Sequence, residues 1–273
     1  MIINCLLHVH SSFSYDSKTD LEDIARTARQ HGYACVLMSD HNNFMNAEST
    51  AALVRRCAEL SRDGLLIVPG LELAFDQNRV HLLAYGIRTF IESTSASCTF
   101  ASLIDAVHQA GGLAILAHPS HRGAMHRIAP ADLTKLDGVE IWNVKNGNRF
   151  VPTASELRLL RRVRAEGGRG WGFAGVDWHH LDKFAPVTVS LDTPVLASDA
   201  VLDQLRLGRF EVKGRYASVA STGESRDTRL AMYATVGETL RQTRRLAYRW
   251  QSAYERRGFK TPRTLAAVAK RFW

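Results

Sequence analysis

Short apolar runs of strand length recur along most of the chain, and segments with helical spacing separate them. The runs cover residues 2–7, 34–39, 65–71, 80–85, 113–117, 139–142 and 172–176. Helical spacing of apolar residues follows at 47–61, 100–110, 153–166 and 199–207, and glycines end several of these segments. Strands that alternate with helices form mostly parallel sheets, so the pattern predicts an α/β fold. Seven strands of this kind favour a barrel over an open sheet.

The connections between these runs carry their own signals. The first helix is expected to begin at Thr19, an N-cap residue with Glu22 three positions later as in a capping box, and to end at Gly32. No helical spacing separates the third run from the fourth, so residues 71–80 are expected to form a hairpin or loop.

The character of the chain changes after about residue 225. Apolar residues then follow three- and four-residue steps, which predicts a long amphipathic helix expected to dock on the main domain, at Leu230, Tyr233, Leu240, Ala247, Trp250 and Tyr254. Thr261 and Pro262 form an N-cap and N1 pair that predicts a final helix ending near Phe272. We therefore divide the chain into a barrel domain, 1–223, and a helical extension, 224–273.

Positive charge gathers in that extension. It holds 12 Lys/Arg and 4 Asp/Glu, while the rest of the chain is balanced, so the net charge of +8 lies entirely in the last fifty residues. Such a surplus predicts an anionic partner, and nucleic acid is one. The alternative is a solvated, arginine-rich helix face.

Composition excludes several classes of protein. Hydrophobic residues make up 45% and charged residues 23%, as in ordinary globular proteins, and no apolar run approaches the roughly 18 residues that span a bilayer. The N-terminal run lacks a basic segment and a cleavage site, so it reads as a buried strand. Cys5, Cys35, Cys57 and Cys98 have no paired spacing and are expected to be free thiols in a reducing cytoplasm.

Polar residues stand where the apolar runs end. Alternation along a strand places His8 and His10 on one face. The later runs carry polar residues at or near their ends, namely Asp40, His41, Glu72, His81, His118, Glu140, Asn143, Asp177 and His179. In parallel α/β barrels the carboxyl ends of the strands form the active-site face, so these side chains are expected to converge.

Burying so many imidazoles and carboxylates together is costly without a compensating partner, and divalent cations supply one. Nitrogen and carboxylate donors suit Zn, Mn or Fe. Single histidines have a plainer interpretation as hydrogen-bonded or surface residues, and we apply it to His31, His108 and His180. The full set predicts a metal site.

The same residues carry a family resemblance. The segments HVHSSFSYDS, SDHN, PGLE, AHP and GVDWH resemble the successive motifs of the PHP (polymerase and histidinol phosphatase) family across about residues 3–215. The resemblance implies a distorted seven-stranded β/α barrel with a trinuclear metal site. It assigns His8, His10, Glu72 and Asp177 to the first metal, Glu72, His81 and His118 to the second, and Asp16, His41 and His179 to the third. Asp40 would orient a ligand histidine from behind.

The resemblance and the donor set predict a metal-dependent hydrolase of phosphoric ester bonds, in which a metal-activated hydroxide attacks the phosphorus. The catalytic set would be His8, His10, Glu72, Asp177 and His179. Cationic residues on the following loops are candidates to bind the substrate phosphate, namely His121, Arg122, Lys145 and Arg149. His121 or His126 is a candidate to protonate the leaving group.

The basic extension favours a nucleotide or oligonucleotide substrate. Histidinol phosphate and phosphotyrosine remain alternatives within the family. An amidohydrolase-type C–N hydrolase ranks lower, because the motif GVDWH adds a histidine after the late aspartate and no lysine ends a predicted strand. A non-catalytic binding module with structural metals is the last alternative.

Overall fold

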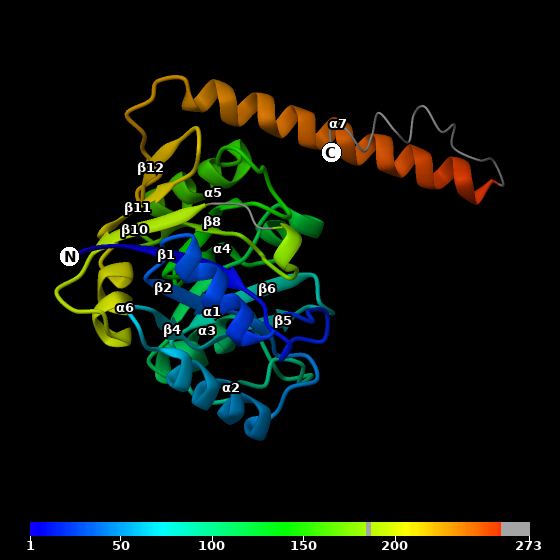
Figure 1. The fold of residues 1–273 in the computed structure, drawn as a ribbon. Coiled ribbons are helices and arrows are strands. Elements are labelled where there is room, and N and C mark those ends of the chain that lie inside the picture. The colour runs from blue at the N-terminus through cyan, green and yellow to red at the C-terminus, as the bar shows by residue number, and fades with distance from the viewer. Residues whose placement is uncertain (184–186, 258–273) are drawn as a thin grey trace.

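A computed structural model describes residues 1–183 and 187–257 (Figure 1). Its strands form two mixed sheets of six strands each. The first has the order β12-β11-β10-β1-β2-β4, with bounds Ser218–Ala220, Phe210–Lys213, Thr188–Asp192, Ile2–Val9, Cys35–Met38 and Leu66–Val68. The second has the order β3-β5-β6-β7-β8-β9, with bounds Asp40–His41, Gly70–Phe75, Val80–Tyr85, Leu113–Leu116, Gly138–Asn143 and Trp171–Gly175.

The two sheets meet where β9 passes β1. The Val176 backbone N–H donates to the Leu7 carbonyl at 3.0 Å, and the His10 N–H donates to the Trp178 carbonyl at 3.0 Å. The α/β prediction is confirmed, and all seven predicted runs contain strands. The single seven-stranded barrel is not confirmed, because β10, β11 and β12 extend β1 with antiparallel pairs and the third run divides at Pro69 between β4 and β5.

The connection from β5 to β6 is a hairpin, as predicted. These strands pair antiparallel, with Glu72 opposite Leu83 and Ala74 opposite His81. Since side chains alternate along a strand, Glu72 and Ala74 share one face of β5, which brings His81 beside Glu72. The hairpin thus brings His81 next to the Glu72 carboxylate, which a parallel connection between the two strands would not do.

Helices cover the sheets, and those predicted at 47–61, 100–110, 153–166 and 199–207 are confirmed within a residue or two. The helices through α6 are α1 Leu21–Gln30, α2 Ala47–Leu60, α3 Phe100–Gln109, α4 Pro130–Leu133, α5 Ala154–Ala165 and α6 Ser198–Arg206, and the 3-10 turns are His121–His126 and Leu181–Lys183. The predicted capping box of α1 is wrong. Asp20, one residue later than predicted, is the N-cap, and its side chain makes no capping bond. The Thr19 hydroxyl is not available as a cap, because it donates to the His179 carbonyl at 3.1 Å.

The predicted long C-terminal helix is α7, Leu230–Arg256. Its first turns pack on the body, where Leu230 and Ala234 join the hydrophobic core, and its second half projects beyond the body (Figure 1). The apolar stripe therefore docks only in part, since Leu240 and Trp250 are 66% and 73% exposed. The final predicted helix, 262–272, lies outside the described residues. No helix in the described part of the chain is long and apolar enough to cross a membrane.

The cysteines fit the prediction of free thiols. Cys5, Cys35 and Cys57 are buried, and Cys98 is half-buried. Burial raises the pKa of the Cys57 thiol well above its usual value, so this thiol stays protonated. These three buried cysteines therefore act as small apolar residues of the core.

Candidate metal centre

The first strand delivers two buried histidines to the centre of the molecule. The register of β1 against β2 shifts between Leu7 and Val9, and His8 has a φ of 62° at this irregularity. The imidazole rings of His8 and His10 then lie 5.2 Å apart, and both side chains are fully buried. The predicted common face is thus present, although a kinked strand end produces it.

Glu72 lies at the middle of the cluster, and its two carboxylate oxygens face different histidines. Oε1 lies 2.7 Å from Nδ1 of His81 and 3.0 Å from Nε2 of His118. Oε2 lies 3.2 Å from Nε2 of His8 and 3.3 Å from Nε2 of His10. A carboxylate with ligand candidates on both oxygens has the geometry of a bridge between two cations.

Asp177 closes the cluster beside the first two histidines. Its Oδ1 lies 3.7 Å from Nε2 of His10 and 3.8 Å from Nε2 of His8. The same oxygen lies 3.4 Å from Nδ1 of His179 and accepts a hydrogen bond of 3.2 Å from Nζ of Lys145. These contacts join the strand end of β9 to that of β1 and to the loop after β8.

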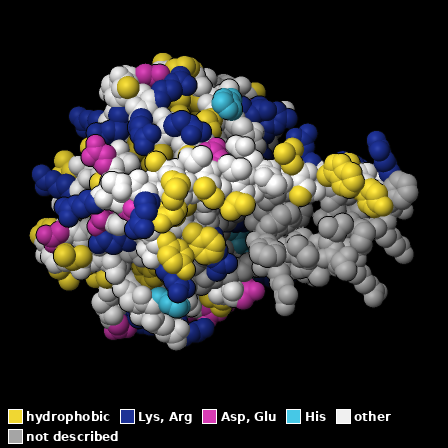
Figure 2. Space-filling view, turned by 90° about the horizontal axis from the view of Figure 1, so that it is seen from above, with side chains coloured by type: hydrophobic (Ala, Val, Ile, Leu, Met, Phe, Trp, Pro, Cys, Tyr) yellow, Lys and Arg dark blue, Asp and Glu magenta, His cyan; other side chains and the backbone are white. Residues whose placement is uncertain are grey.

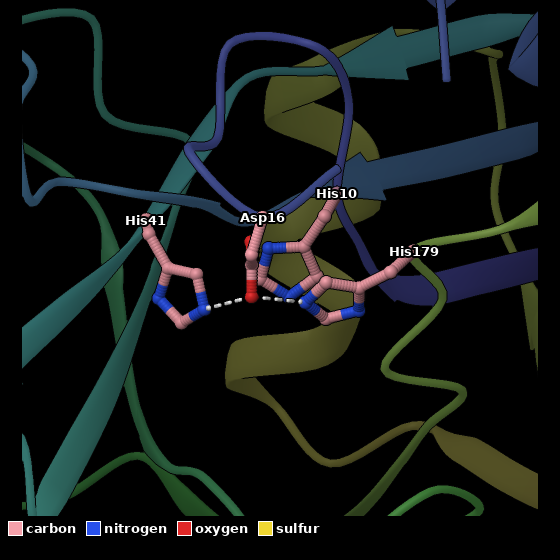
Figure 3. A group of neighbouring side chains, drawn as sticks. All are labelled: His10, Asp16, His41 and His179. Atoms are coloured by element: carbon pink, nitrogen blue, oxygen red, sulfur yellow. Dashed lines mark ion pairs between the residues drawn. The ribbon is translucent and has the colours of Figure 1, made fainter. Parts of the chain in front are cut away.

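Asp16 comes from the loop after β1 and faces a separate pair of histidines (Figure 3). Its Oδ2 lies 3.0 Å from Nε2 of His179 and 3.5 Å from Nε2 of His41. The rings of His10 and His179 stack at 4.0 Å. Hydrogen bonds from Ser17 and Thr19 to the His179 carbonyl hold this segment against the loop that carries Asp16.

All nine predicted ligands are therefore brought together, in overlapping groups whose donor atoms lie within 4.8 Å of one another. Two buried nitrogens, Nε2 of His10 and Nδ1 of His41, have no hydrogen-bond partner within the described ranges. Burial would raise the pKa of Glu72, but the surrounding histidines, His81 foremost, hold it well below its usual value. An anionic carboxylate among imidazole nitrogens, two of which make no hydrogen bond within the described ranges, fits divalent cations.

The pKa values of Asp16 and His10, at the edge of the cluster, also suit metal binding. Burial would raise the pKa of the Asp16 carboxyl, yet hydrogen bonds with His179 and His41 lower it. The pKa of His10 lies well below its usual value, because burial and the neighbouring His179 both disfavour the imidazolium. A neutral imidazole is the form that binds a metal.

Glu140, which the sequence analysis noted only as a strand-end residue, holds the cluster from behind. It accepts hydrogen bonds from Nδ1 of His8 and from the His118 backbone N–H, both 2.8 Å long. Asn143 donates to the same carboxylate at 3.0 Å. Gly175 on β9 leaves room for this contact, since a Cβ there would overlap the Glu140 carboxylate and His8. Glu140 thus fixes the His8 tautomer that presents Nε2 to the cluster.

Substitution Glu140→Gln is expected to weaken metal binding by about 10- to 100-fold while leaving the fold intact, because the imidazole of His8 loses its anionic partner. Metal titration followed by calorimetry measures the change. Glu59→Gln, on exposed α2 surface, is the matched control. Unchanged affinity in Glu140→Gln would show that Glu140 does not orient the ligand.

Asp40 reaches the cluster through serine hydroxyls, and it does not touch a ligand imidazole. It accepts hydrogen bonds from the Ser11 backbone N–H at 2.6 Å and from the Ser14 hydroxyl at 3.1 Å. The Ser14 oxygen lies 3.2 Å from Nδ1 of His10 and accepts from the His41 backbone N–H at 2.8 Å. Burial raises the pKa of Asp40 to about 6. Ser14 was missed because a serine in a loop carries no spacing signal.

The candidate phosphate residues divide into two groups. Lys145 lies at the cluster, with Nζ 3.2 Å from both Asp177 and the ring nitrogens of His179. The His121 ring lies 5.3 Å from that of His118, edge to face. Arg122 donates to the Asn78 carbonyl at 3.2 Å. Arg149 and His126 are exposed, and no recorded hydrogen bond or ion pair of the described chain joins either to the cluster.

Lys145 also changes one argument from the sequence. It follows β8 by two residues, so a lysine does stand close to a strand end. The absence of such a lysine therefore no longer separates phosphoesterases from amidohydrolase-type enzymes here.

Three of the candidate ligands have left-handed backbone conformations. The φ angles are 62° for His8, 28° for His118 and 52° for Asp177. Non-glycine residues adopt such angles at a cost of about 1–3 kcal/mol each, and they concentrate at functional sites. The strand ends are therefore bent to aim these side chains inward.

Solved structures with this fold include a protein with a predicted metal-dependent phosphoesterase and an endonuclease. A two-domain protein from Bacteroides vulgatus containing a predicted PHP-like metal-dependent phosphoesterase aligns with a TM-score of 0.59 and 13% identity, over 81% of this chain and 67% of that one. The lesion-specific endonuclease PfuEndoQ from Pyrococcus furiosus aligns with a TM-score of 0.55 and 12% identity, over 81% of this chain and 59% of that one. PsfC from Pseudomonas syringae gives a TM-score of 0.55 and 13% identity, over 89% and 98%.

At these identities the alignments establish the fold. No curated protein matches the chain. Residues 7–121, which contain seven of the nine candidate ligands, match the PHP domain family. The resemblance predicted from the motifs is thus confirmed over these residues.

Proposed function

We propose that this protein is a metal-dependent phosphoesterase that hydrolyses phosphate esters of a nucleotide or oligonucleotide. The observation that carries the proposal is the buried cluster of six imidazoles around Glu72, Asp16 and Asp177, in which donor nitrogens lack hydrogen-bond partners within the described ranges. Divalent cations bound there supply Lewis acidity, which activates water and neutralises charge on phosphoryl oxygens. Zn, Mn and Fe all suit this donor set.

The ligands divide into three sets in this proposal. His8, His10, Glu72 and Asp177 form the first set, Glu72 with His81 and His118 the second, and Asp16, His41 and His179 the third. The Glu72 contacts on both oxygens support its role as the shared ligand. The barrel domain, 1–223, contains every ligand, and the extension, 224–273, adds positive charge.

Other residues of the chain bind and orient the substrate. The Lys145 ammonium group lies beside Asp177 and is suited to bind a phosphoryl oxygen of the substrate. His121 lies beside the candidate ligand His118, at a position suited to protonate the leaving group. The basic extension favours a polyanionic substrate. The endonuclease Q structure with a 27-mer duplex, at a TM-score of 0.50 and 12% identity, shows that this fold accommodates DNA in another protein.

Phosphate release from a panel of esters tests the proposal. The panel comprises mononucleotides, dinucleotides, short oligonucleotides, histidinol phosphate and phosphotyrosine, each with Mn, Zn or Fe. We expect one class to turn over and His179→Ala to lose at least about a hundredfold in rate, because a ligand to the metals is lost. His180→Ala, the exposed neighbouring histidine, is the matched control.

One alternative remains supported by an observation. Lys145 beside Asp177 and His179 is also compatible with a C–N hydrolase, so the panel includes a set of cyclic and N-acyl amides. Amide turnover without ester turnover would replace our proposal. Bound metal with no turnover of either kind would indicate a binding module.

A further inference from the structure

A groove lies between the start of α7 and the loop that follows β8. It has a volume of about 490 Å³, within the usual range of ligand sites. Phe150, Tyr216, Val236 and Leu240 line it and are 54%, 54%, 52% and 66% exposed. A contiguous exposed apolar surface of this kind is typical of a binding site. Figure 2 shows hydrophobic side chains gathered along the helix, with Lys and Arg side chains nearby.

The aromatic residues of the groove have fixed positions. The rings of Phe150 and Tyr216 contact edge to face at 5.9 Å, and the Arg215 guanidinium lies over the Tyr216 ring at 5.3 Å. Gly237 allows α7 to approach the loop, because a Cβ there would overlap the Asn148 side chain. Two half-exposed rings held in this way offer flat surfaces to a planar ligand.

One loop connects this groove to the metal centre. Lys145 and Asn146 of that loop contact the Asp177 carboxylate at 3.2 and 2.5 Å, and Phe150 follows Lys145 by five residues. The Asn148 carbonyl accepts a hydrogen bond of 2.8 Å from the buried Trp142 indole, which fixes the loop between the two. Five residues span at most about 17 Å, so the groove lies close to the cluster.

Arginines adjoin lining residues of the groove in the sequence. Arg149 precedes Phe150 and Arg215 precedes Tyr216, and both arginines are exposed. A third arginine, Arg229, lines the groove and is paired with Asp227, the acidic residue of the lining. Aromatic faces with flanking arginines are the combination that binds single-stranded nucleic acid, where bases stack and phosphates meet the guanidinium groups.

We propose that this groove, called here the Phe150 groove, binds a nucleobase of a single-stranded nucleic acid whose backbone reaches the metal centre. The inference rests on the proposed function and names its substrate class more closely. Phe150 stacks on the base, and Tyr216, whose ring meets that of Phe150 edge to face, contacts the edge of the base. Arg149 and Arg215 contact the neighbouring phosphates. The groove therefore determines which substrates gain affinity beyond the phosphate itself.

The test compares an oligonucleotide with a small diester in the full chain loaded with Mn. Binding of a fluorescein-labelled single-stranded oligonucleotide is measured by anisotropy, and turnover of bis(p-nitrophenyl) phosphate is measured in parallel. We expect Phe150→Ala to weaken oligonucleotide binding by about tenfold more than it changes the KM for the diester, as for the loss of one stacked base. Phe150→Trp is expected to restore binding, and Leu207→Ala, 53% exposed at the end of α6, is the control.

A scan with single abasic sites locates the base. In the wild type, one abasic position is expected to weaken binding by about tenfold, and in Phe150→Ala the same position should make no further difference. Unchanged binding in Phe150→Ala, or a concentration-dependent dimer that this variant abolishes, would overturn the proposal. An equal loss for the oligonucleotide and for the small diester would mean that Phe150 only supports the Lys145 loop, which would also overturn the proposal. Binding is measured apart from turnover. Failure of diester hydrolysis alone would therefore contradict the proposed function, while the binding data would still decide whether the groove binds a base.

Discussion

Substitution Glu72→Gln is expected to reduce metal-dependent turnover by roughly a thousandfold or more. Its carboxylate contacts five histidines through two oxygens at 2.7–3.4 Å, and the side chain is 1% exposed. A substitution that only disturbs a ligand's orientation costs about 10- to 100-fold, so loss of the shared ligand itself should cost more. Glutamine keeps the shape of the side chain but removes the negative charge that two cations would share.

Metal content by elemental analysis and turnover of the best ester are measured on the same sample. Circular dichroism and a cooperative thermal transition verify that Glu72→Gln is folded. Glu92→Gln, on an exposed loop, controls for the loss of one charge. A Glu72→Gln protein with full metal content and unchanged rate would refute the central role of this carboxylate.

Removal of divalent cations by a chelator is expected to lower the thermal unfolding temperature by at least about 5 °C. Any ion that binds only the folded state stabilises it, by about 2.7 kcal/mol at a hundredfold excess over its dissociation constant. For a domain of this size, each kcal/mol corresponds to about 2–4 °C. The cluster is suited to such a dependence, because its imidazoles and carboxylates are buried and two nitrogens lack hydrogen-bond partners within the described ranges.

Scanning calorimetry with and without chelator measures this effect, and readdition of Mn, Zn or Fe should reverse it. The same experiment on Glu72→Gln should show a much smaller response, since fewer ions are bound. An identical unfolding temperature in chelator and in saturating metal would mean that the cluster contributes to folding without cations.

Local sequence signals were sufficient for much of this molecule. The runs of buried strands, the helices ended by glycines and the strand-end histidines His8, His10 and His118 all follow rules that act within a few residues. The candidate ligand positions could be named from the sequence because a metal centre would require a restricted set of donor types. Their convergence required only that strand ends meet at one face.

Long-range contacts decided what the sequence did not reveal. Strand β10 pairs with β1 across more than 180 residues, β11 and β12 follow it in the sheet, and none of the three contains a continuous apolar run. Thr19 has the composition of a helix cap, but its hydroxyl bonds to His179 instead. Ser14 and Glu140 support ligands across the fold, and nothing in their neighbouring residues distinguishes them from ordinary polar positions. Tertiary structure outweighed local propensity in each case.

The left-handed backbone at His8, His118 and Asp177 has a consequence for engineering this protein. Glycine adopts such angles without the steric cost of a Cβ, so glycine at any of the three would relieve local backbone strain. It would also remove a buried side chain that pairs within the cluster, such as His8 with Glu140 or Asp177 with Lys145, and leave that partner unsatisfied. Replacing residues with a positive φ by glycine is therefore a poor route to a more stable protein at these positions, because each strained residue is also a polar partner of its neighbours.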